Sequence, residues 1–340
     1  MRVFQIAGDW GFENLQLAER NIPKPGRGQI LISMKMAALN ARDLIVPDRG
    51  YGRATGQLPL IPVSDGVGEV VEIGEGVSRV SIGDRVCPTY FQNWVSGEPD
   101  PTRFASALGG PLDGVMAEFI CLSEEGVVKV PDYLTDAEAA TLPCAALTAW
   151  SALSTLGQTK AGQKILVQGT GGVALFAIAF AKLQGAHVTV ISSRDEKLEK
   201  AREIGADATI NYTATPDWAR ASREITADRG GYDNIIELGG EKTLPLSLRA
   251  VRPGGTLSMI GVLSGLNLTA SLGPIVARQL RLQGVTVGHR DGFEAMLAAM
   301  EQHQIRPVIG EIYAFSKLKQ ALASLQDHNI LGKTLMQISS

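Results

Sequence analysis

The spacing of apolar residues changes character near residue 160 of this chain. Before about residue 140, apolar residues form short β-type runs, such as 29–39 ("QILISMKMAAL") and 66–74 ("GVGEVVEIG"), which glycine and proline clusters separate. This pattern predicts a compact unit of mostly antiparallel strands.

From Lys164 onward, strand-like and helix-like runs alternate. The runs "KILVQ" (164–168) and "HVTVIS" (187–192) predict strands, and 173–184 and 195–204 predict helices. Such alternation predicts parallel strands joined by crossover helices. After Gly288, "FEAMLAAMEQ", "VIGEIYAF" and "SKLKQALASLQ" predict a helix, a strand and a second helix, and "GKTLMQI" closes the chain.

Composition narrows the protein class. The chain has 340 residues, 45% hydrophobic and 20% charged, which is enough for two domains with sizeable cores. A net charge of −3 without a Lys/Arg run disfavours nucleic acid and anionic membranes as partners, and a small-molecule substrate is expected instead. No signal-like or bilayer-length apolar run is found, so we expect a cytoplasmic protein. The three scattered cysteines predict reduced thiols rather than disulfides.

A glycine turn follows the first predicted parallel strand. Gly169, Gly171 and Ala174 match the G-x-G-x-x-G/A spacing, which permits a tight turn, close approach of a pyrophosphate and tight helix packing. The free N–H groups at the start of the helix favour an anion there. We therefore predict a dinucleotide at Gly169, Thr170, Gly171, Gly172 and Val173.

The end of the second parallel strand indicates which nucleotide binds. No carboxylate stands at the position that usually holds the ribose 2′-hydroxyl of NAD; Ser192, Ser193 and Arg194 occupy it, and Lys197 follows. Hydroxyls and an arginine suit a 2′-phosphate, so NADP(H) is preferred over NAD(H). In the alternative interpretation, Ser193 and Glu196 form a capping box and Arg194 is a solvated helix residue.

Motifs along nearly the whole chain carry a family resemblance. Among them are "ALNARDL", "PVSDGVGEVVEIGEGV", "AATLPCAALTAW", "ILVQGTGGVA" and "RPGGTLSMIGVLSG". With these the chain resembles the medium-chain dehydrogenase/reductase superfamily. The resemblance implies an α/β protein with a mostly-β GroES-like catalytic domain at 1–145 and 289–340, and a Rossmann doubly wound domain at 146–288.

The resemblance also bears on zinc. Zinc members of this superfamily carry ligands at the positions of Asn40, Ser64 and Cys144, and only the cysteine could bind zinc here. The four-cysteine lobe of such members is absent, and the four histidines show no ligand spacing. We expect a metal-free protein that resembles the quinone oxidoreductase branch, although similar sequences are also called alcohol dehydrogenases.

Without a Lewis acid, hydride transfer to a quinone or enone is favoured over reduction of a simple carbonyl, because the developing charge spreads over a phenolate or enolate. Asn40, Asp43 and Tyr51 match the "N-x-x-D…G-x-Y" stretch of zinc-free members. The resemblance implies that Asn40 orients the nicotinamide or the substrate oxygen, that Asp43 supports it and that Tyr51 donates a hydrogen bond or proton.

Each of these residues also has a structural interpretation. Asn40 could cap a turn, Asp43 could start a helix, and Tyr51 could be a surface residue. Asp65 is interpreted as a buried structural carboxylate. Cys144 is either a thiolate at a helix N-terminus or a small buried apolar residue.

Further cofactor contacts follow from the resemblance. Gly261, Val262 and Leu263 would place backbone amides beside the nicotinamide carboxamide. Asn211 and Tyr212 would flank the adenosine half. Lys333, in the late Gly332-Lys333 pair, would reach a cofactor phosphate or be solvated.

Residues 91–115 form the least regular segment, which suits a working loop or lid. We expect Phe91 and Trp94 to form an apolar wall for a planar substrate ring, or else to pack on their own domain or on a second copy. The resemblance implies a homodimer, with the strand region near 257–272 extending the Rossmann sheet into a partner's sheet.

Three functions remain open at this point: an NADP(H)-dependent quinone or enone reductase, a zinc-free alcohol or aldehyde oxidoreductase, and a non-catalytic nucleotide-binding relative.

Overall fold

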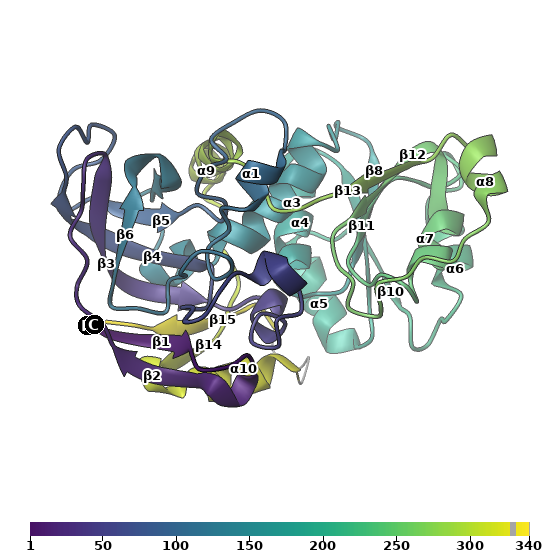
Figure 1. Ribbon diagram of the computed structural model, residues 1–340. Coiled ribbons are helices and arrows are strands. Elements are labelled where there is room, and N and C mark those ends of the chain that lie inside the picture. The colour runs from purple at the N-terminus through teal and green to yellow at the C-terminus, as the bar shows by residue number, and fades with distance from the viewer. Residues whose placement is uncertain (327–330, 340) are drawn as a thin grey trace. The chain divides into compact units, whose positions relative to one another are not determined.

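The structure is a computed structural model that describes residues 1–326 and 331–339. The chain divides into two compact units (Figure 1). The split unit contains Met1–Leu147 and Val287–Ser340, and the central unit contains Thr148–Thr286. The boundaries expected from the sequence, after residues 145 and 288, lie close to these.

The split unit is built mainly from strands. One sheet has the order β14-β15-β3-β4-β5-β7, with β6 paired to β3, and a second sheet pairs β1 with β2. The strands are β1 (Arg2–Ile6), β2 (Leu15–Glu19), β3 (Gln29–Ala38), β4 (Asp65–Ile73), β5 (Arg85–Pro88), β6 (Phe119–Ser123), β7 (Val127–Lys129), β14 (Ile309–Ala314) and β15 (Lys333–Gln337).

Short helices connect these strands. The α-helices are α1 (Pro101–Phe104), α2 (Asp136–Ala139), α9 (Arg290–His303) and α10 (Leu318–Gln326). The 3-10 helices are η1 (Phe12–Asn14), η2 (Ala41–Leu44), η3 (Gly52–Thr55), η4 (Glu124–Gly126) and η7 (Phe315–Lys317), and η5 (Leu142–Ala146) is a π-helical turn. The core packs apolar residues from both ends of the chain, such as Ile32 and Met336, against each other.

The central unit is a doubly wound parallel sheet with the order β10-β9-β8-β11-β12-β13. Its strands are β8 (Lys164–Gln168), β9 (His187–Ser192), β10 (Ala208–Asn211), β11 (Tyr232–Glu237), β12 (Val251–Met259) and β13 (Arg281–Gly284). Its helices are α4 (Gly172–Leu183), α5 (Asp195–Ile204), α6 (Trp218–Ile225), α7 (Leu244–Ala250) and α8 (Leu272–Ala277); α3 (Leu147–Trp150) and the π-helical turn η6 (Ser151–Thr155) precede β8.

The sequence patterns explain why the central unit forms. Strands β8 and β11 are bordered by parallel strands on both sides and are almost entirely buried, which matches their continuous apolar runs. Helix α4 is apolar on most of its surface and contributes seven buried residues. The predicted α/β fold class, with a mostly-β GroES-like domain and a Rossmann domain, is confirmed.

One expectation about the sheet edge is wrong. The region 257–272 was expected to be an exposed edge strand, but β12 ends at Met259 and pairs with both β11 and β13. Residues 260–271 form no regular strand or helix. The edge strand on this side of the sheet is therefore β13, and β10 is the edge strand on the other side.

None of the helices within the described ranges combines the length and apolar character that crossing a bilayer requires.

Candidate active site

The tight turn after β3 carries two of the three predicted catalytic residues. The backbone N–H of Asn40 donates to Oδ2 of Asp43 at 2.8 Å, and the N–H of Asp43 donates to the Asn40 carbonyl at 2.9 Å. This reciprocal pair closes η2, as in a capping box. Asn40 does cap a turn, as its structural interpretation proposed, and its side-chain amide is left for another contact.

That contact comes from the opposite end of the chain. Lys333 is the first residue of β15 and is 5% exposed; its ammonium donates to the Leu39 carbonyl at 2.6 Å and to Oδ1 of Asn40. The backbone supports this contact, because the N–H of Leu39 donates to the carbonyl of Thr334 at 2.9 Å. The expectation that Lys333 reaches a cofactor phosphate stays a prediction, and the structure gives its ammonium these two oxygens of the split unit as partners.

The lysine fixes the orientation of the Asn40 amide. An ammonium group only donates hydrogen bonds, so the group of Asn40 that faces it must be the oxygen. The amide nitrogen is thereby turned to the other side. This buried Nδ2 carries two N–H groups; the Asp65 carboxylate lies near enough to accept from one of them, and no other acceptor is found for it among the described residues. Asn40 thus presents an oriented donor.

Asp65, at the start of β4, is a buried carboxylate close to the same group of residues. It is fully buried, and it accepts the Ser64 hydroxyl on Oδ1 at 2.6 Å and the backbone N–H of Cys144 on Oδ2 at 2.9 Å. Burial raises the pKa of Asp65, against the opposing effects of the Lys333 charge and of hydrogen bonds from Ser64, Asn40 and Cys144. These partners match the interpretation of Asp65 as a structural carboxylate.

Cys144 lies in the π-helical turn η5. Burial, with a contribution from the Asp65 charge, raises its pKa to about 12. The thiol is therefore protonated at neutral pH, and the thiolate interpretation is wrong. The helix N-terminus does not lower the pKa here because desolvation and a nearby carboxylate outweigh it.

Tyr51, the third predicted catalytic residue, lies just before η3 and is 46% exposed. The guanidinium of Arg42 lies near enough to its phenol to act on it electrostatically. Burial raises the pKa of Tyr51 and Arg42 opposes that rise, while Asp43 and Cys144 add to it. The structure thus brings Asn40, Asp43 and Tyr51 together around one arginine, which the sequence reasoning did not single out although it stands between Asn40 and Asp43.

The expectation for Phe91 and Trp94 needs correction. Their exposed fractions are only 4% and 8%, and their ring centroids lie 5.7 Å apart. Phe104 packs against both rings, and the Trp94 indole also meets His289 of the same unit at 5.6 Å. These rings bury one another because a loop of this length gains order by packing its own aromatics. The alternative of packing on their own domain holds, and they form no open substrate wall.

In the central unit, the glycine turn has the features that a pyrophosphate needs. Gly169 has φ +75°, and its N–H donates to the Ile191 carbonyl at 2.7 Å, so the turn is tight. A Cβ built on Gly169 or on Gly171 would meet no atom within 4 Å, which leaves the backbone open on that side. Ala174 is fully buried under the start of α4. Thr170 is buried between them, and Gly172 and Val173 open the helix.

The end of β9 is polar and basic. Ser192 is buried, with its hydroxyl 3.4 Å from that of Thr170, whereas Arg194 is exposed at the N-cap of α5. The N-cap of α5 is Arg194, whose side chain makes no capping hydrogen bond, so the N-cap does not fall on Ser193 as the predicted capping box with Glu196 requires. Partial burial and repulsion from Arg194 lower the pKa of Lys197. Two neighbouring cations therefore stand where an NAD-specific site has its carboxylate.

The adjacent strand β10 ends at Asn211. The side-chain amide of Asn211 donates to Asp195 at 2.8 Å, and the backbone N–H of Tyr212 donates to the Ser192 carbonyl at 3.0 Å. The side chain of Tyr212 is 41% exposed. Both residues lie at the carboxyl edge of the sheet, beside the end of β9.

A buried network that the sequence analysis missed supports this edge at β8 and β11. The Gln168 amide donates to Glu237 at 2.6 Å and to Ser247 at 2.8 Å, and its oxygen accepts the N–H groups of Leu238 and Gly239, each at 3.1 Å. These bonds hold the loop after β11 rigid. The polar Gln168 at the end of an apolar strand was the available signal.

The three predicted amide donors after β12, at Gly261, Val262 and Leu263, differ in whether the protein already uses them. The N–H of Gly261 is used by the Glu237 carbonyl at 3.2 Å, and a Cβ at Gly261 would lie 2.0 Å from the Leu238 carbonyl, so only glycine fits. Val262 and Leu263 are 49% and 69% exposed, and within the described residues their N–H groups have no backbone or side-chain acceptor. Those two amides are available to a ligand.

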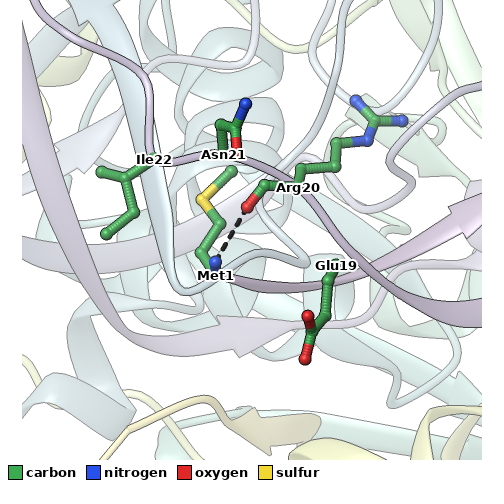
Figure 2. A pocket seen from close by; sticks show the side chains of 5 residues that line it. All are labelled: Met1, Glu19, Arg20, Asn21 and Ile22. Atoms are coloured by element: carbon green, nitrogen blue, oxygen red, sulfur yellow. Dashed lines mark hydrogen bonds between the residues drawn. The ribbon is translucent and has the colours of Figure 1, made fainter.

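A surface depression at the N-terminus is a different feature. Figure 2 shows its five lining residues, with the terminal ammonium of Met1 donating to the Arg20 carbonyl at 2.8 Å. None of them belongs to the polar groups around Asn40 or to the glycine turn, so the depression carries no part of the site.

Comparisons with known proteins agree with this geometry. An alcohol dehydrogenase GroES-like domain model matches residues 26–132, and a zinc-binding dehydrogenase model matches residues 172–302. A zinc-type alcohol dehydrogenase-like protein from Schizosaccharomyces pombe is 41% identical over 96% of each chain. The chain belongs to the medium-chain dehydrogenase/reductase superfamily. It is an oxidoreductase of the alcohol dehydrogenase-like part of that superfamily.

Other members show the range of chemistry in this superfamily. A crystal structure of an NAD-dependent alcohol dehydrogenase has a TM-score of 0.90 and 29% identity, with complete coverage of both chains. An acryloyl-coenzyme A reductase from Sulfurisphaera tokodaii is 26% identical over 96% of this chain and 97% of its own.

The zinc of many superfamily members does not fit the residues of this chain. The oxygen of Asn40 faces an ammonium, the Ser64 hydroxyl donates to Asp65, and Cys144 is the one thiol among the three positions. Zinc requires three protein ligands such as thiolate or imidazole. Residues 1–326 and 331–339 contain no group of three His, Cys, Asp or Glu side chains that could hold a metal. His289 caps α9 through its Nδ1, and His328 lies outside the described residues.

Asp43 generates a prediction about stability and pH. Burial raises its pKa from 3.8 to about 6 in the folded protein, so the folded state takes up a proton between about pH 4 and 6 that the unfolded state does not. Stability from this group is therefore gained as pH falls below about 6. Relative to Asp43→Asn, the wild-type unfolding free energy should rise between about pH 6 and 4 by about 1.4 kcal/mol per pH unit, to a total of about 3 kcal/mol, and should change little between pH 7 and 6.

Denaturant unfolding of both proteins across this pH range measures the difference. Asp48→Asn, an exposed carboxylate nearby in sequence, is the control and should show no such trend. A difference between wild type and Asp43→Asn that stays constant with pH would contradict the raised pKa.

Proposed function

We propose that the protein is an NADP(H)-dependent, zinc-independent reductase of quinones or α,β-unsaturated carbonyls. The observation that carries the proposal is the hydrogen bond from Lys333 to the Asn40 oxygen, which turns the Asn40 nitrogen away from the lysine with an N–H to spare beside Asp65 and puts a cation where zinc ligation would need a free anionic or neutral ligand. An amide donor is sufficient for a delocalised enolate or phenolate, whereas a localised alkoxide needs a Lewis acid or strong acid.

Residues of the split unit would bind the substrate oxygen and supply a proton. Asn40 would donate to the substrate oxygen as negative charge develops on it. Asp43 would hold the backbone of Asn40, and Lys333 its side chain. Tyr51, half exposed, would donate the proton that completes the reduction and recover one from water.

The central unit would hold the cofactor. Backbone N–H groups at Gly169–Val173 would face the pyrophosphate, and the amides of Val262 and Leu263 would meet the nicotinamide carboxamide. The bound reduced nicotinamide would supply the hydride. Arg194 and Lys197 would contact the 2′-phosphate, which would relieve the repulsion that lowers the pKa of Lys197.

A substrate panel tests the reaction class. Purified protein without added metal is assayed with a quinone, an enone and an aldehyde plus NADPH, and with alcohols plus NADP⁺; zinc is measured by elemental analysis. We expect no stoichiometric zinc, no loss on chelation, and a kcat/KM for quinone or enone at least about tenfold above the others.

Alcohol oxidation that depends on about one zinc per chain would replace the proposal with the function named for the alcohol dehydrogenase relatives. Zinc-free turnover of alcohols or aldehydes alone would indicate a zinc-free alcohol or aldehyde oxidoreductase. Cofactor binding without turnover of any substrate would favour a non-catalytic relative.

Cofactor choice can be tested at Arg194. Arg194→Ala should weaken NADPH binding by about 10- to 150-fold and leave NADH nearly unchanged, because a charge-assisted contact of about 1.5 to 3 kcal/mol is lost only with the 2′-phosphate. Calorimetric titration of both cofactors gives the two affinities. Arg220→Ala removes an exposed arginine of the same unit and should change neither. An equal loss for NADPH and NADH would mean that Arg194 acts on the fold.

We also propose a homodimer formed through the β13 edge. The residues before that strand expose large apolar side chains, with Leu266 at 83% and Leu272 and Val276 at 73% each. A free strand edge beside such a surface favours pairing with a second copy.

Light scattering at micromolar concentration should therefore give twice the chain mass. The double variant Leu266→Asp, Val276→Asp should be monomeric, whereas Leu156→Asp, at a 45% exposed site of the same unit, should stay dimeric. A monomeric wild-type protein would exclude this proposal.

A further inference from the structure

A cavity of ≈ 300 Å³ lies at the amino edge of the central sheet, where β8 and β13 begin. Its volume is at the lower end of the range for small-molecule sites. None of its nine lining residues is acidic, and three are cations. We call it the amino-edge cavity; the lining residues that matter below include Lys160, Gln163, Arg252, Thr256 and Arg281.

Arg252 is held in place by a buried carboxylate behind the cavity. Its Nε donates to Oδ1 of Asp233 at 2.7 Å, and the Asp233 side chain is only 3% exposed. The other oxygen of Asp233 accepts the backbone N–H of Lys164 at 2.8 Å and lies 3.7 Å from the guanidinium of Arg229. One carboxylate therefore serves two arginines, and this side of the cavity stays positive.

The other two cations have no counter-charge. Arg281 lies along the sheet face, because its Nε donates to the hydroxyl of the buried Thr256 at 3.1 Å and a terminal nitrogen donates to the Gly254 carbonyl at 3.4 Å. The ammonium of Lys160 has no hydrogen-bond acceptor in the described part of the chain. Neither cation has a carboxylate within ion-pair distance among residues 1–326 and 331–339.

The walls of the cavity are shaped by two further residues. Oε1 of Gln163 accepts the backbone N–H of Lys160 at 3.0 Å, so the amide nitrogen of Gln163 is turned away from that bond as a spare donor. A Cβ on Gly157 would lie 2.1 Å from the Ala152 carbonyl and 2.9 Å from Nδ2 of Asn234. Only glycine therefore lets the chain after η6 lie this close to β11.

We propose that the amino-edge cavity binds a small anion of the phosphate class with at least two negative charges, such as a diphosphate. The anion would relieve the repulsion among three cations that line one small space. A phosphate group has three or more acceptor oxygens in tetrahedral directions, so it can accept from an ammonium, a guanidinium and an amide together. A planar carboxylate offers only two oxygens.

This site is separate from the glycine turn. The turn follows the carboxyl end of β8, whereas Gln163 precedes its amino end. The five residues of β8 span about 13 Å at about 3.3 Å per residue, so one diphosphate cannot contact both places. The inference therefore goes beyond cofactor binding and does not rest on the class of reaction.

The test is calorimetric titration of inorganic pyrophosphate into the full chain, in a buffer free of phosphate. The protein is first saturated with the nicotinamide cofactor that it binds more tightly, so that the glycine turn is filled. We expect one pyrophosphate per chain. Lys160→Gln and Arg281→Gln should each weaken binding by at least about threefold, and the double variant by at least about tenfold.

Matched variants control for charge and for folding. Lys160→Arg keeps the positive charge and should bind pyrophosphate within about twofold of wild type. Arg220→Gln removes an exposed cation elsewhere in the central unit and should change nothing. Circular dichroism identifies variants that do not fold.

Three results would overturn the inference. Loss of pyrophosphate binding when the cofactor is present would assign the anion to the glycine turn. Unchanged affinity in a folded double variant would exclude Lys160 and Arg281 as ligands. Citrate, a carboxylate of comparable charge, should bind at least about tenfold more weakly than pyrophosphate, and equal affinities would exclude a site selective for phosphate.

Discussion

The contact between Lys333 and the turn at Leu39 and Asn40 is the constraint on which the proposed active site depends. It joins residues 293 positions apart, and it places a full positive charge inside the split unit. Because the ammonium can only donate, it sets which end of the Asn40 amide faces outward. The same charge opposes the burial effect on the pKa of Asp65, and that carboxylate in turn holds the backbone at Cys144. One side chain therefore organises the turn, the start of β4 and the π-helical turn η5.

A second, smaller constraint operates in the central unit. Gln168 and Glu237 sit at the carboxyl ends of neighbouring strands, and their hydrogen bonds fix the loop that precedes α7. The loop after β12 then lies against this backbone closely enough that only glycine fits at 261. Two amides, at Val262 and Leu263, remain without protein partners as a result. A polar network buried in an apolar sheet is costly unless it is satisfied, and this one fixes the backbone at the carboxyl edge of the sheet.

Much of the fold could be predicted from the sequence, because its signals are local. The runs at 164–168 and 187–192 coincide with β8 and β9, and the helix predicted at 195–204 coincides with α5. Their apolar periods and the glycine turn depend only on neighbours in the chain. The strand at the sheet edge was missed because β13 is short and has a mixed sequence, whereas the more apolar β12 is paired on both sides.

The site was less predictable because its contacts are distant in sequence. Asn40, Asp43 and Tyr51 could be selected from one motif, but the partner of Asn40 comes from the last strand. Burial cannot be seen in a sequence, and it determines the protonation of the Cys144 thiol and the packing of the Phe91 and Trp94 rings. Arg42 was overlooked because an arginine beside an aspartate usually indicates a solvated pair, whereas here the guanidinium is buried against carbonyl groups and an aromatic ring.

The split of one unit between the two chain ends has a consequence for biosynthesis. The central unit is continuous from Thr148 to Thr286 and can fold as soon as that stretch has left the ribosome. The site around Asn40 cannot be completed until Lys333, 293 residues after Asn40, has been translated. A chain released from the ribosome before Lys333 would therefore hold a complete central unit and no anchored Asn40.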